Sequence, residues 1–444
     1  MKKSSRNKAL GLLVLTSALL FNQGGVSAEI TNSQQQLIKA QMEKKTGNYV
    51  AGELIVGMNK NCTIDTKGEN KSSLFGIDAK VIDDLTLKKS AKGDNFNQVL
   101  LIKVDTKLDL LNVVEQLEAL PEVEYAEPNY IVSADEAQAD EEKSVSANYP
   151  LVSAGVIPND PDWDLLWGLE KIDMPNAWDV TTGSEEVKVA VIDSGIDYTH
   201  EDLAANVDAS QGYDFVDDDN DPQDEYSHGT HIAGTIGAET NNGVGVSGIN
   251  WDITMIPLRV LDDENKGKTS NSIKAINWAT EQNYPVANYS ISSSSYSHSL
   301  EEAIENYQGL LVVSAGNKGE DYTTTPRYPA CLDISNMVTV GNSKENDQKS
   351  SGSSYSKTGV DLFAPGNKIY STLPGNQYGN KNGTSMATPH VTGSAALALA
   401  ANSNLTTNDL KENILNSVDK IDTLTDFCQT GGRLNTYKLL QLSK

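Results

Sequence analysis

The chain has few basic residues for its length of 444. Lysine and arginine together number 35, against 61 aspartates and glutamates, which gives a formal charge of −26 at pH 7. A surface this acidic repels phosphate groups, so the charge balance argues against nucleic acid as a partner. It is compatible with high solubility and with the binding of divalent cations.

Long apolar runs are also scarce. The one clear example, residues 9–21, follows the basic start MKKSSRNK and leads to small residues that end at Ala28. At 13 residues it is too short to span a bilayer. We predict a secretory signal peptide over residues 1–28, with an uncleaved anchor as the alternative. Because no other run approaches the ~20 residues of a spanning helix, we expect no membrane contact after its removal.

Only three cysteines are present, and an odd count leaves at least one thiol unpaired. A secreted chain meets an oxidising compartment, where disulfides persist. Cys62 lies far ahead of the other two, so we predict a disulfide between Cys331 and Cys428. The alternative is that all three cysteines are reduced and buried.

Residues 29–133 alternate between strand and helix patterns. Apolar runs at 50–58, 98–104 and 123–132 predict strands, and LDLLNVVEQLEALPEV, which spans 108–123, predicts a helix that stops at Pro121. We therefore expect a small α+β domain here. Residues 134–150 are acidic and poor in apolar side chains, which indicates a linker or an exposed cleavage region.

Residues 151–444 have a different pattern, in which short apolar runs alternate with helical stretches. The runs lie at 188–195, 253–261, 284–292, 309–316, 337–341 and 360–366. This alternation predicts an α/β domain with a doubly wound, mostly parallel sheet and helices on both faces. In such sheets the active site lies at the carboxyl ends of the strands.

Three polar motifs stand at such ends. VAVIDSGID places Asp193 after a strand, HGTHIAGT places His228 at the opening of a helix, and NGTSMATPH places Ser385 at the start of another. Each alone is compatible with a turn residue, a structural histidine or a cap. Together they supply a nucleophile, its base and the group that orients the base. Pro389 is expected in the first turn, where a missing N–H costs little.

Other chemistries lack their signatures. The chain has no HExxH pattern, which argues against a zinc protease. Ser385 has no GxSxG elbow around it, which argues against an α/β-hydrolase. A protein that only binds would not be expected to keep all three catalytic residue types.

The three motifs, in this order, resemble those of the subtilisin-like serine proteases (subtilases, peptidase family S8), over about residues 159–444. The preceding domain resembles the ferredoxin-like, inhibitory propeptide of that family. The resemblance implies a secreted, monomeric endopeptidase that cleaves polypeptides and processes itself from a proenzyme. It assigns Asp193 as the orienting carboxylate, His228 as general base and then acid, and Ser385 as nucleophile.

The resemblance also implies a substrate groove. VVSAGNKG matches the segment that supplies the oxyanion donor, here Asn317. The implied substrate-binding residues are Ser290, Ile291, Ser292, Ser314, Ala315, Gly316, Lys318 and Arg327. Lys318 and Arg327 match positions of the first specificity pocket, so we hypothesise that it accepts acidic side chains. The alternative is that both cations face solvent and selectivity is broad.

Calcium is the cofactor that the resemblance implies. THEDL places Asp202 where the family binds this ion, together with a loop here represented by Asn242 in NNGVGVSG. A second stretch, DFVDDDNDPQDE, resembles a calcium-binding segment of the thermitase-like branch. Its candidate ligands are Asp214, Asp217, Asp219, Asp221 and Gln223. The oxygen donors suit Ca²⁺, and the alternative is a solvated acidic loop.

Overall fold

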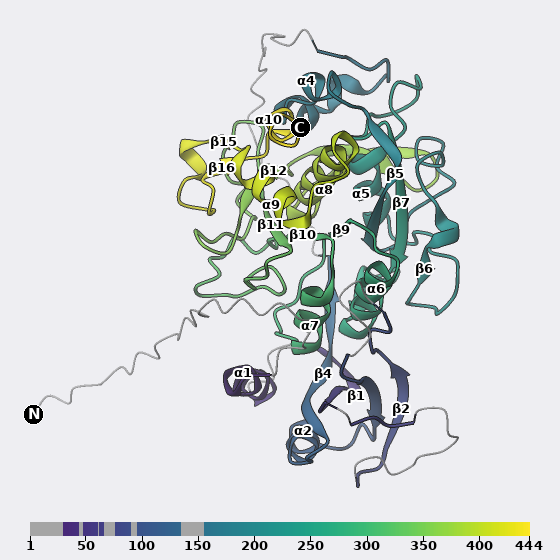
Figure 1. Ribbon diagram of the computed structural model, residues 1–444, viewed down its shortest axis with the longest axis vertical. Helices are drawn as coiled ribbons and strands as arrows, with labels where there is room; N and C mark the ends of the chain where they lie inside the picture. Colours follow the sequence, from purple (N-terminus) through teal and green to yellow (C-terminus); the bar gives the residue numbers. More distant parts are fainter. Residues whose placement is uncertain (1–29, 44–47, 61, 66–75, 90–95, 135–154) are drawn as a thin grey trace, which may run out of the picture.

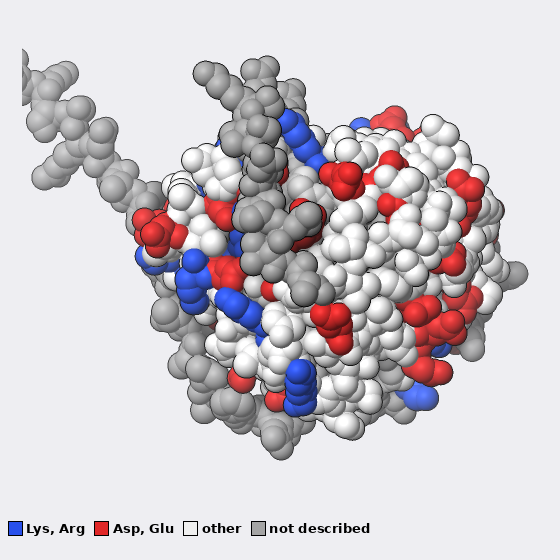
Figure 2. All heavy atoms as spheres, turned by 90° about the horizontal axis from the view of Figure 1, so that it is seen from above, with Lys and Arg blue, Asp and Glu red and all other residues white. Residues whose placement is uncertain are grey.

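The computed structural model describes residues 30–43, 48–60, 62–65, 76–89, 96–134 and 155–444 (Figure 1). The predicted signal peptide and all but the first residue of the predicted linker lie outside these ranges. Within them, the structure holds no helix whose length and apolar character would let it cross a bilayer. Acidic side chains form several patches on the face seen in Figure 2, in keeping with the charge of the chain.

The described residues of the N-terminal domain form two helices and four strands. They are α1 (Asn32–Glu43), β1 (Tyr49–Met58), β2 (Ala79–Asp84), β3 (Val99–Val104), α2 (Leu110–Glu118) and β4 (Val123–Ser133). Helix α2 forms as its sequence pattern predicts, because Leu110, Val113, Val114 and Leu117 recur on one face and are buried. The carboxylate of Asp109 caps it by accepting from the amide of Leu111 at 3.1 Å.

The strands of this domain form an antiparallel sheet in the order β2-β3-β1-β4. A short strand of the second domain, β8 (Lys266–Lys268), extends the sheet by pairing with β4. The order β4-β1-β3-β2, with α2 between β3 and β4, is that of a ferredoxin-like sheet, as predicted. Helix α1 precedes β1, and residues 61 and 66–75, between β1 and β2, lie outside the described ranges.

The second domain is built on a nine-stranded sheet in the order β15-β16-β12-β11-β10-β9-β5-β7-β6. These strands are β5 (Gly183–Asp193), β6 (Tyr213–Asp214), β7 (Asp252–Arg259), β9 (Val286–Tyr289), β10 (Leu310–Ser314), β11 (Met337–Ser343), β12 (Leu362–Pro365), β15 (Asp419–Lys420) and β16 (Gly432–Arg433). All neighbours pair in parallel except β15 with β16. A separate hairpin joins β13 (Ile369–Leu373) and β14 (Gln377–Lys381). The predicted doubly wound sheet is confirmed.

Helices cover both faces of this sheet. They are α3 (Trp167–Lys171), α4 (Met174–Trp178), α5 (His228–Gly237), α6 (Thr269–Glu281), α7 (His298–Asn306), α8 (Thr384–Ala401), α9 (Thr407–Asn416) and α10 (Thr436–Leu442). Single 3-10 turns lie at Trp163–Leu165, Ala209–Gln211 and Asp422–Leu424. Alternate residues of the central strand β5 pack into two different apolar clusters, Val189 and Val191 in one and Ala190 and Ile192 in the other. Side chains of a strand point alternately to its two faces, so the clusters lie on opposite faces.

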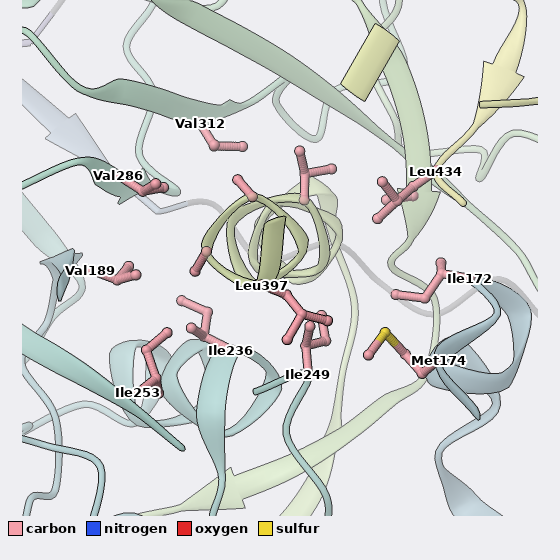
Figure 3. Close-up of a cluster of buried hydrophobic side chains, with 14 of the residues drawn as sticks. Ile172, Met174, Val189, Ile236, Ile249, Ile253, Val286, Val312, Leu397 and Leu434 are labelled. Carbon is pink, nitrogen blue, oxygen red and sulfur yellow. The ribbon is translucent and has the colours of Figure 1, made fainter. Parts of the chain in front are cut away.

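Helix α8 runs through the middle of the first cluster. Figure 3 shows it end-on, with Val189, Val286 and Val312 of the sheet on one side and Ile172 and Met174 on the other. Helix α8 has no charged residue and is buried along most of its length, from Thr384 to Leu399. The helix that carries Ser385 near its start is therefore held in place by its packing in the hydrophobic core.

The predicted disulfide between Cys331 and Cys428 is not formed, and all three cysteines are free thiols. The sulfur of Cys428 lies near two carbonyl oxygens of its own loop, those of Leu424 and Gly432. Cys331 packs against two apolar clusters, and burial raises the pKa of its thiol to about 12. The alternative is right in that all three cysteines are reduced, but only Cys428 is buried, whereas Cys62 and Cys331 are partly exposed. A thiol held protonated in this way is a poor partner for oxidation.

His390 provides a test of this buried core. Its ring Nδ1 donates to the carbonyl of Met386 at 2.9 Å, and burial lowers its pKa to about 4. Unfolding exposes the ring, whose pKa then returns to about 6.5. Between these values the unfolded chain binds the extra proton, so the contribution of His390 to stability is lost as pH falls through 6.5 towards 4.

We therefore expect the melting temperature of the chain to exceed that of a His390→Gln variant by less at pH 4.5 than at pH 8. Both proteins should carry Ser385→Ala, which the family resemblance implies to be inactive, so that self-digestion does not interfere. A difference that is constant or grows on acidification would contradict a neutral buried imidazole.

Candidate active site

Asp193 and His228 meet at the carboxyl end of the central strand. Asp193 is the last residue of β5, His228 is the first residue of α5, and Asp193 Oδ1 lies 2.7 Å from His228 Nδ1. Both side chains are fully buried. Asp193 Oδ1 also accepts from the amide of Ser194 at 2.8 Å. Since carboxylate oxygens only accept, His228 carries its proton on Nδ1, and its Nε2 has no hydrogen-bond partner within the described part of the chain.

A buried carboxylate that sequence reasoning missed holds His228 in place. Asp224 accepts from the amides of Tyr226, Ser227 and Thr230 and from the hydroxyls of Ser194 and Thr230. It thus caps the start of α5, where the helix dipole favours negative charge. Ser194 Oγ in turn accepts from the amide of Gly229 at 2.9 Å. The one available signal was an acidic residue four positions before the histidine.

Ser385 is the second residue of α8, directly after a sharp turn. Gly383 precedes the helix with φ of 148°, and a Cβ there would lie 3.0 Å from Asn317 Nδ2. Only glycine meets both demands. Ser385 Oγ donates to the carbonyl of Ser290 at 3.3 Å. The structure therefore places Ser385, Ser290 and Asn317 around one small space.

Pro389 lies deeper in α8 than expected, as its sixth residue rather than in its first turn. A residue there would normally donate its N–H to the carbonyl of Ser385, four positions earlier, and proline cannot. The hydroxyl of Ser290 takes over and donates to that carbonyl at 3.2 Å. Because Pro389 leaves the carbonyl of Ser385 free, Ser290 can bind Ser385 twice, through its hydroxyl to that carbonyl and through its own carbonyl to Ser385 Oγ.

Asn317 is oriented by the residue before Ser385. Its Oδ1 accepts from the amide of Thr384 at 2.8 Å and from the hydroxyl of Thr384 at 3.1 Å. This pair of bonds determines which end of the side-chain amide is the donor. The hydroxyl of Thr384 also accepts from the amide of Gly316 at 3.1 Å. Asn317, which the sequence analysis proposed as the oxyanion donor, thus lies next to the start of α8.

The last residues of β4 lie between two edges of the second domain. On one edge, Ser133 and Ser292 exchange both backbone hydrogen bonds, at 3.1 and 2.9 Å. On the other edge, Val132 pairs with Gly267 of β8. The predicted substrate-binding segment at Ser290–Ser292 is therefore already paired with an extended piece of the N-terminal domain. The carbonyl of Ala134 accepts from Asn265 Nδ2 at 2.5 Å.

The second expected wall of the groove is the end of β10, with Ser314, Ala315 and Gly316, all buried. Arg327 lies against it, since a Cβ on Gly316 would be 3.4 Å from Arg327 Cγ. Its Nη2 is 3.5 Å from Ser292 Oγ, and the residue is 8% exposed. Lys318 is exposed. The alternative in which both cations face solvent is therefore wrong for Arg327.

The N-terminal domain also caps two helices of the second domain. Glu127, fully buried, accepts from the amides of His298 and Ser299 at the start of α7 and from the hydroxyls of Ser297 and Ser299. Asn129 Oδ1 accepts from the amide of Ser270 near the start of α6 at 3.0 Å. Unsatisfied helix N–H groups thus find acceptors across the domain boundary.

Asp202 and Asn242 do come together, with Asn242 Nδ2 donating to Asp202 Oδ1 at 3.0 Å. A third residue, Asp160, was missed by the sequence analysis. It is 3% exposed and accepts from the amides of Asn241, Asn242 and Gly243 in the same loop. Burial raises the pKa of Asp202 to about 6, and the charge of Asp160 adds to that rise. Two buried carboxylates therefore face one loop.

The acidic loop at 214–225 is organised by an arginine instead. Arg259, at the end of β7, contacts Asp214 at 2.5 Å, Asp217 at 3.1 Å and Glu225 at 2.6 Å. Asp214 also accepts from two backbone amides of its loop, those of Val216 and Asp217. The other candidates lie apart from Arg259. Asp219 accepts from the amide of Asp221, Asp221 accepts from Tyr198, and Gln223 donates to Asp197.

Comparison with known proteins agrees with this geometry. The subtilase family, peptidase S8, matches residues 184–435, and the fervidolysin N-terminal prodomain matches residues 35–129. The chain belongs to the subtilase family and is a subtilisin-like serine protease that carries a propeptide.

Individual relatives support the same class. The thermophilic serine proteinase of Bacillus sp. (strain AK1) is 34% identical over 433 residues, which is 97% of each chain. Thermitase of Thermoactinomyces vulgaris is 38% identical over 288 residues, 64% of this chain and 99% of thermitase. Subtilisin BL of Lederbergia lenta is 37% identical over 258 residues, 57% of this chain and 91% of that subtilisin.

The Arg259 cluster yields a stability prediction. Replacing Arg259 by methionine leaves buried Asp214 without its cation, so we expect a loss of about 3–5 kcal/mol in the free energy of unfolding. Urea denaturation of the Ser385→Ala protein measures it. The matched control is Lys266→Met, which breaks an exposed pair with Glu264 at 2.7 Å and should change little. Equal effects of the two substitutions would rule out this role for Arg259.

Proposed function

We propose that this protein is a secreted serine endopeptidase that acts through Asp193, His228 and Ser385 and processes itself from a proenzyme. The observation that carries the proposal is the 2.7 Å contact between Asp193 and His228 at the end of β5. Helix α8, whose second residue is Ser385, packs against the helix that carries His228. An acid, a base and a hydroxyl gathered at the carboxyl edge of a parallel sheet are what acyl transfer requires.

In the proposed reaction, Ser385 Oγ attacks the carbonyl carbon of a peptide bond and passes its proton to His228 Nε2. Asp193 keeps the imidazole in the correct tautomer and stabilises the imidazolium. The oxyanion is stabilised by Asn317 Nδ2, by the backbone N–H of Ser385 and by the positive end of α8. His228 then donates the proton to the leaving amine, and water releases the acyl group by the reverse steps.

The domain boundaries that we propose are a signal peptide at 1–28, an inhibitory propeptide at 29–133, an acidic linker at 134–150 and the catalytic domain at 151–444. The position of β4 between Gly267 and Ser292 supports inhibition, because it occupies the pairing positions that a substrate would need. The helix caps from Glu127 and Asn129 add polar contacts to that interface. Secretion is supported by the sequence pattern of the first 28 residues, and we propose that the mature enzyme acts as a monomer.

We propose one calcium site at Asp160, Asp202 and Asn242. Both carboxylates are buried, face the loop at 241–247 and receive hydrogen bonds from its amides and from Ser247. The described residues contain no cluster of three or more His, Cys, Asp or Glu placed to hold a metal. Asn242 and backbone carbonyls would therefore have to complete the oxygen shell. Bound calcium would neutralise the two carboxylates and stabilise the loop.

The acidic loop fits a metal less well. The cation that Asp214 and Asp217 require is already supplied by Arg259. Asp219, Asp221 and Gln223 are each engaged with a different neighbour. We therefore propose calcium at Asp202, and a variant of the acidic loop tests the second site.

The catalytic proposal predicts that Ser385→Ala abolishes self-processing and lowers kcat by about 10⁶-fold, because nucleophile and base act as one unit. Asn317→Ala should lower kcat by about 10²–10³-fold and leave KM nearly unchanged, since the donor acts on the transition state. Exposed Asn404→Ala is the control and should behave as the unmodified enzyme. Cleavage of a peptide substrate and electrophoresis of the proenzyme give both readouts. A purified Ser385→Ala protein that still processed itself would refute the triad.

The calcium proposal predicts that chelation lowers the melting temperature of the Ser385→Ala protein and that calcium restores it. Calcium at a hundred times its Kd should stabilise by about 2.7 kcal/mol. Asp202→Asn should abolish the response, whereas Asp217→Asn in the acidic loop should preserve it. Loss of the response in Asp217→Asn alone would move the site to the acidic loop, and no response in the parent protein would dismiss calcium altogether.

A further inference from the structure

The strand that fills the groove has a definite register. Backbone bonds run from Ser133 to Ser292 and from Ser292 to Ser133, so these two residues form a hydrogen-bonded antiparallel pair. In such ladders the hydrogen-bonded pairs recur at every second residue. If the same ladder continued by two residues along the chain, position 135 would stand opposite Ser290.

That position is next to the nucleophile. The carbonyl oxygen of Ser290 lies 3.3 Å from Ser385 Oγ. Successive carbonyls of an extended strand point to opposite sides. The carbonyl of Ala134 is held on the far side by Asn265. An extended continuation of the strand would therefore aim the next carbonyl at the opposite side, where Ser385 and Asn317 lie. The register therefore selects the peptide bond that follows residue 135, which is Asp135–Glu136 in the sequence.

The side of the groove at this point carries a buried cation. Arg327 lies between Ser292, 3.5 Å from its Nη2, and Gly316, which its side chain packs against. A guanidinium in such a setting, 8% exposed, favours a carboxylate as its partner. The residue that the register delivers here is an aspartate, although it lies outside the described part of the chain.

We propose that the enzyme makes its maturation cut between Asp135 and Glu136, and that Arg327 selects an acidic residue immediately before the cleaved bond. The inference rests on the proposed triad and names its substrate class. Chemically, Ser385 forms an ester with the Asp135 carbonyl while the bond to the Glu136 nitrogen breaks. His228 carries the proton from the serine to that nitrogen. Water then hydrolyses the ester, leaving a carboxyl-terminal Asp135 and an amino-terminal Glu136.

The first test follows the full-length protein during refolding, with mass spectrometry of the earliest products. We expect a propeptide fragment that ends at Asp135, and no fragments from Ser385→Ala. A first cut after Ala134, or among the acidic residues at 140–142, would overturn the register while leaving the triad intact. Cutting that persists in Ser385→Ala would instead remove the proposed function.

The second test exchanges charges. Asp135→Lys and Arg327→Glu should each slow the first cut by at least about tenfold, because a hydrogen bond to a charged group is lost. The variant that carries both changes should recover most of the rate, which also shows that Arg327→Glu can fold. Asp140→Asn, which removes a carboxylate of the same linker away from the proposed bond, is the control and should cut at the normal rate. Failure of the paired variant to recover would overturn the role of Arg327.

A third measurement requires no variant of the protein. The mature enzyme is compared on two peptides that differ only in the residue before the bond, Val-Ser-Ala-Asp and Val-Ser-Ala-Asn, each with a chromogenic amide. Aspartate and asparagine have nearly the same shape, so the ratio of kcat/KM isolates the charge. We expect a ratio of about ten or more in favour of aspartate. A ratio of one or below would overturn the acidic preference even if the cut at Asp135 were found.

Discussion

The buried contact between Asp193 and His228 constrains everything around it. A carboxylate with no exposure to solvent is costly unless hydrogen bonds replace its hydration. Asp193 has two such bonds, to His228 and to the amide of Ser194, and both donors stay in place only if the start of α5 is fixed. Asp224 fixes it by accepting from three amides and two hydroxyls. Two carboxylates thus act in series: Asp193 orients His228, and Asp224 orients the helix that carries His228.

The N-terminal domain uses the same physical principle across the domain boundary. Glu127 supplies the acceptor that the first amides of α7 lack, and Asn129 does so for α6. Strand β4 then satisfies two further backbone edges, at Gly267 and Ser292. Without the N-terminal domain, these backbone N–H and C=O groups would have to bind water or substrate. Association of the two domains is therefore coupled to completion of helices and strands that belong to the protease.

The sequence predicted what depends on contiguous residues and missed what depends on distant pairs. Asp193, His228 and Ser385 stand in unbroken motifs at strand and helix ends, so their order and their elements could be predicted. Strand β8 has the sequence KGK, which carries no strand pattern, and its three residues pair with β4, while Gly267 also bridges to Leu261.

The failures have the same physical origin. Pro389 was misplaced because the exact start of α8 depends on Gly383 fitting against Asn317, a contact made across 66 residues of chain. The Cys331–Cys428 bridge was wrong because cysteine number and compartment say nothing about where each sulfur points in the fold. Asp160 and Arg259 were overlooked because the groups that give them a role lie at least 34 residues away.

Two of the few arginines of this acidic protein lie where they bind carboxylates. Every arginine in the described ranges is buried: Arg259, Arg327 and Arg433. Arg259 and Arg433 each join carboxylates of separate segments, the latter binding Asp347 and Asp419. A planar guanidinium suits this work because it stays charged when buried and binds carboxylates through two nitrogens. Arg327 lies against Ser292 and Gly316, and our proposal gives it the same chemistry, with a carboxylate of the polypeptide to be cut as its partner.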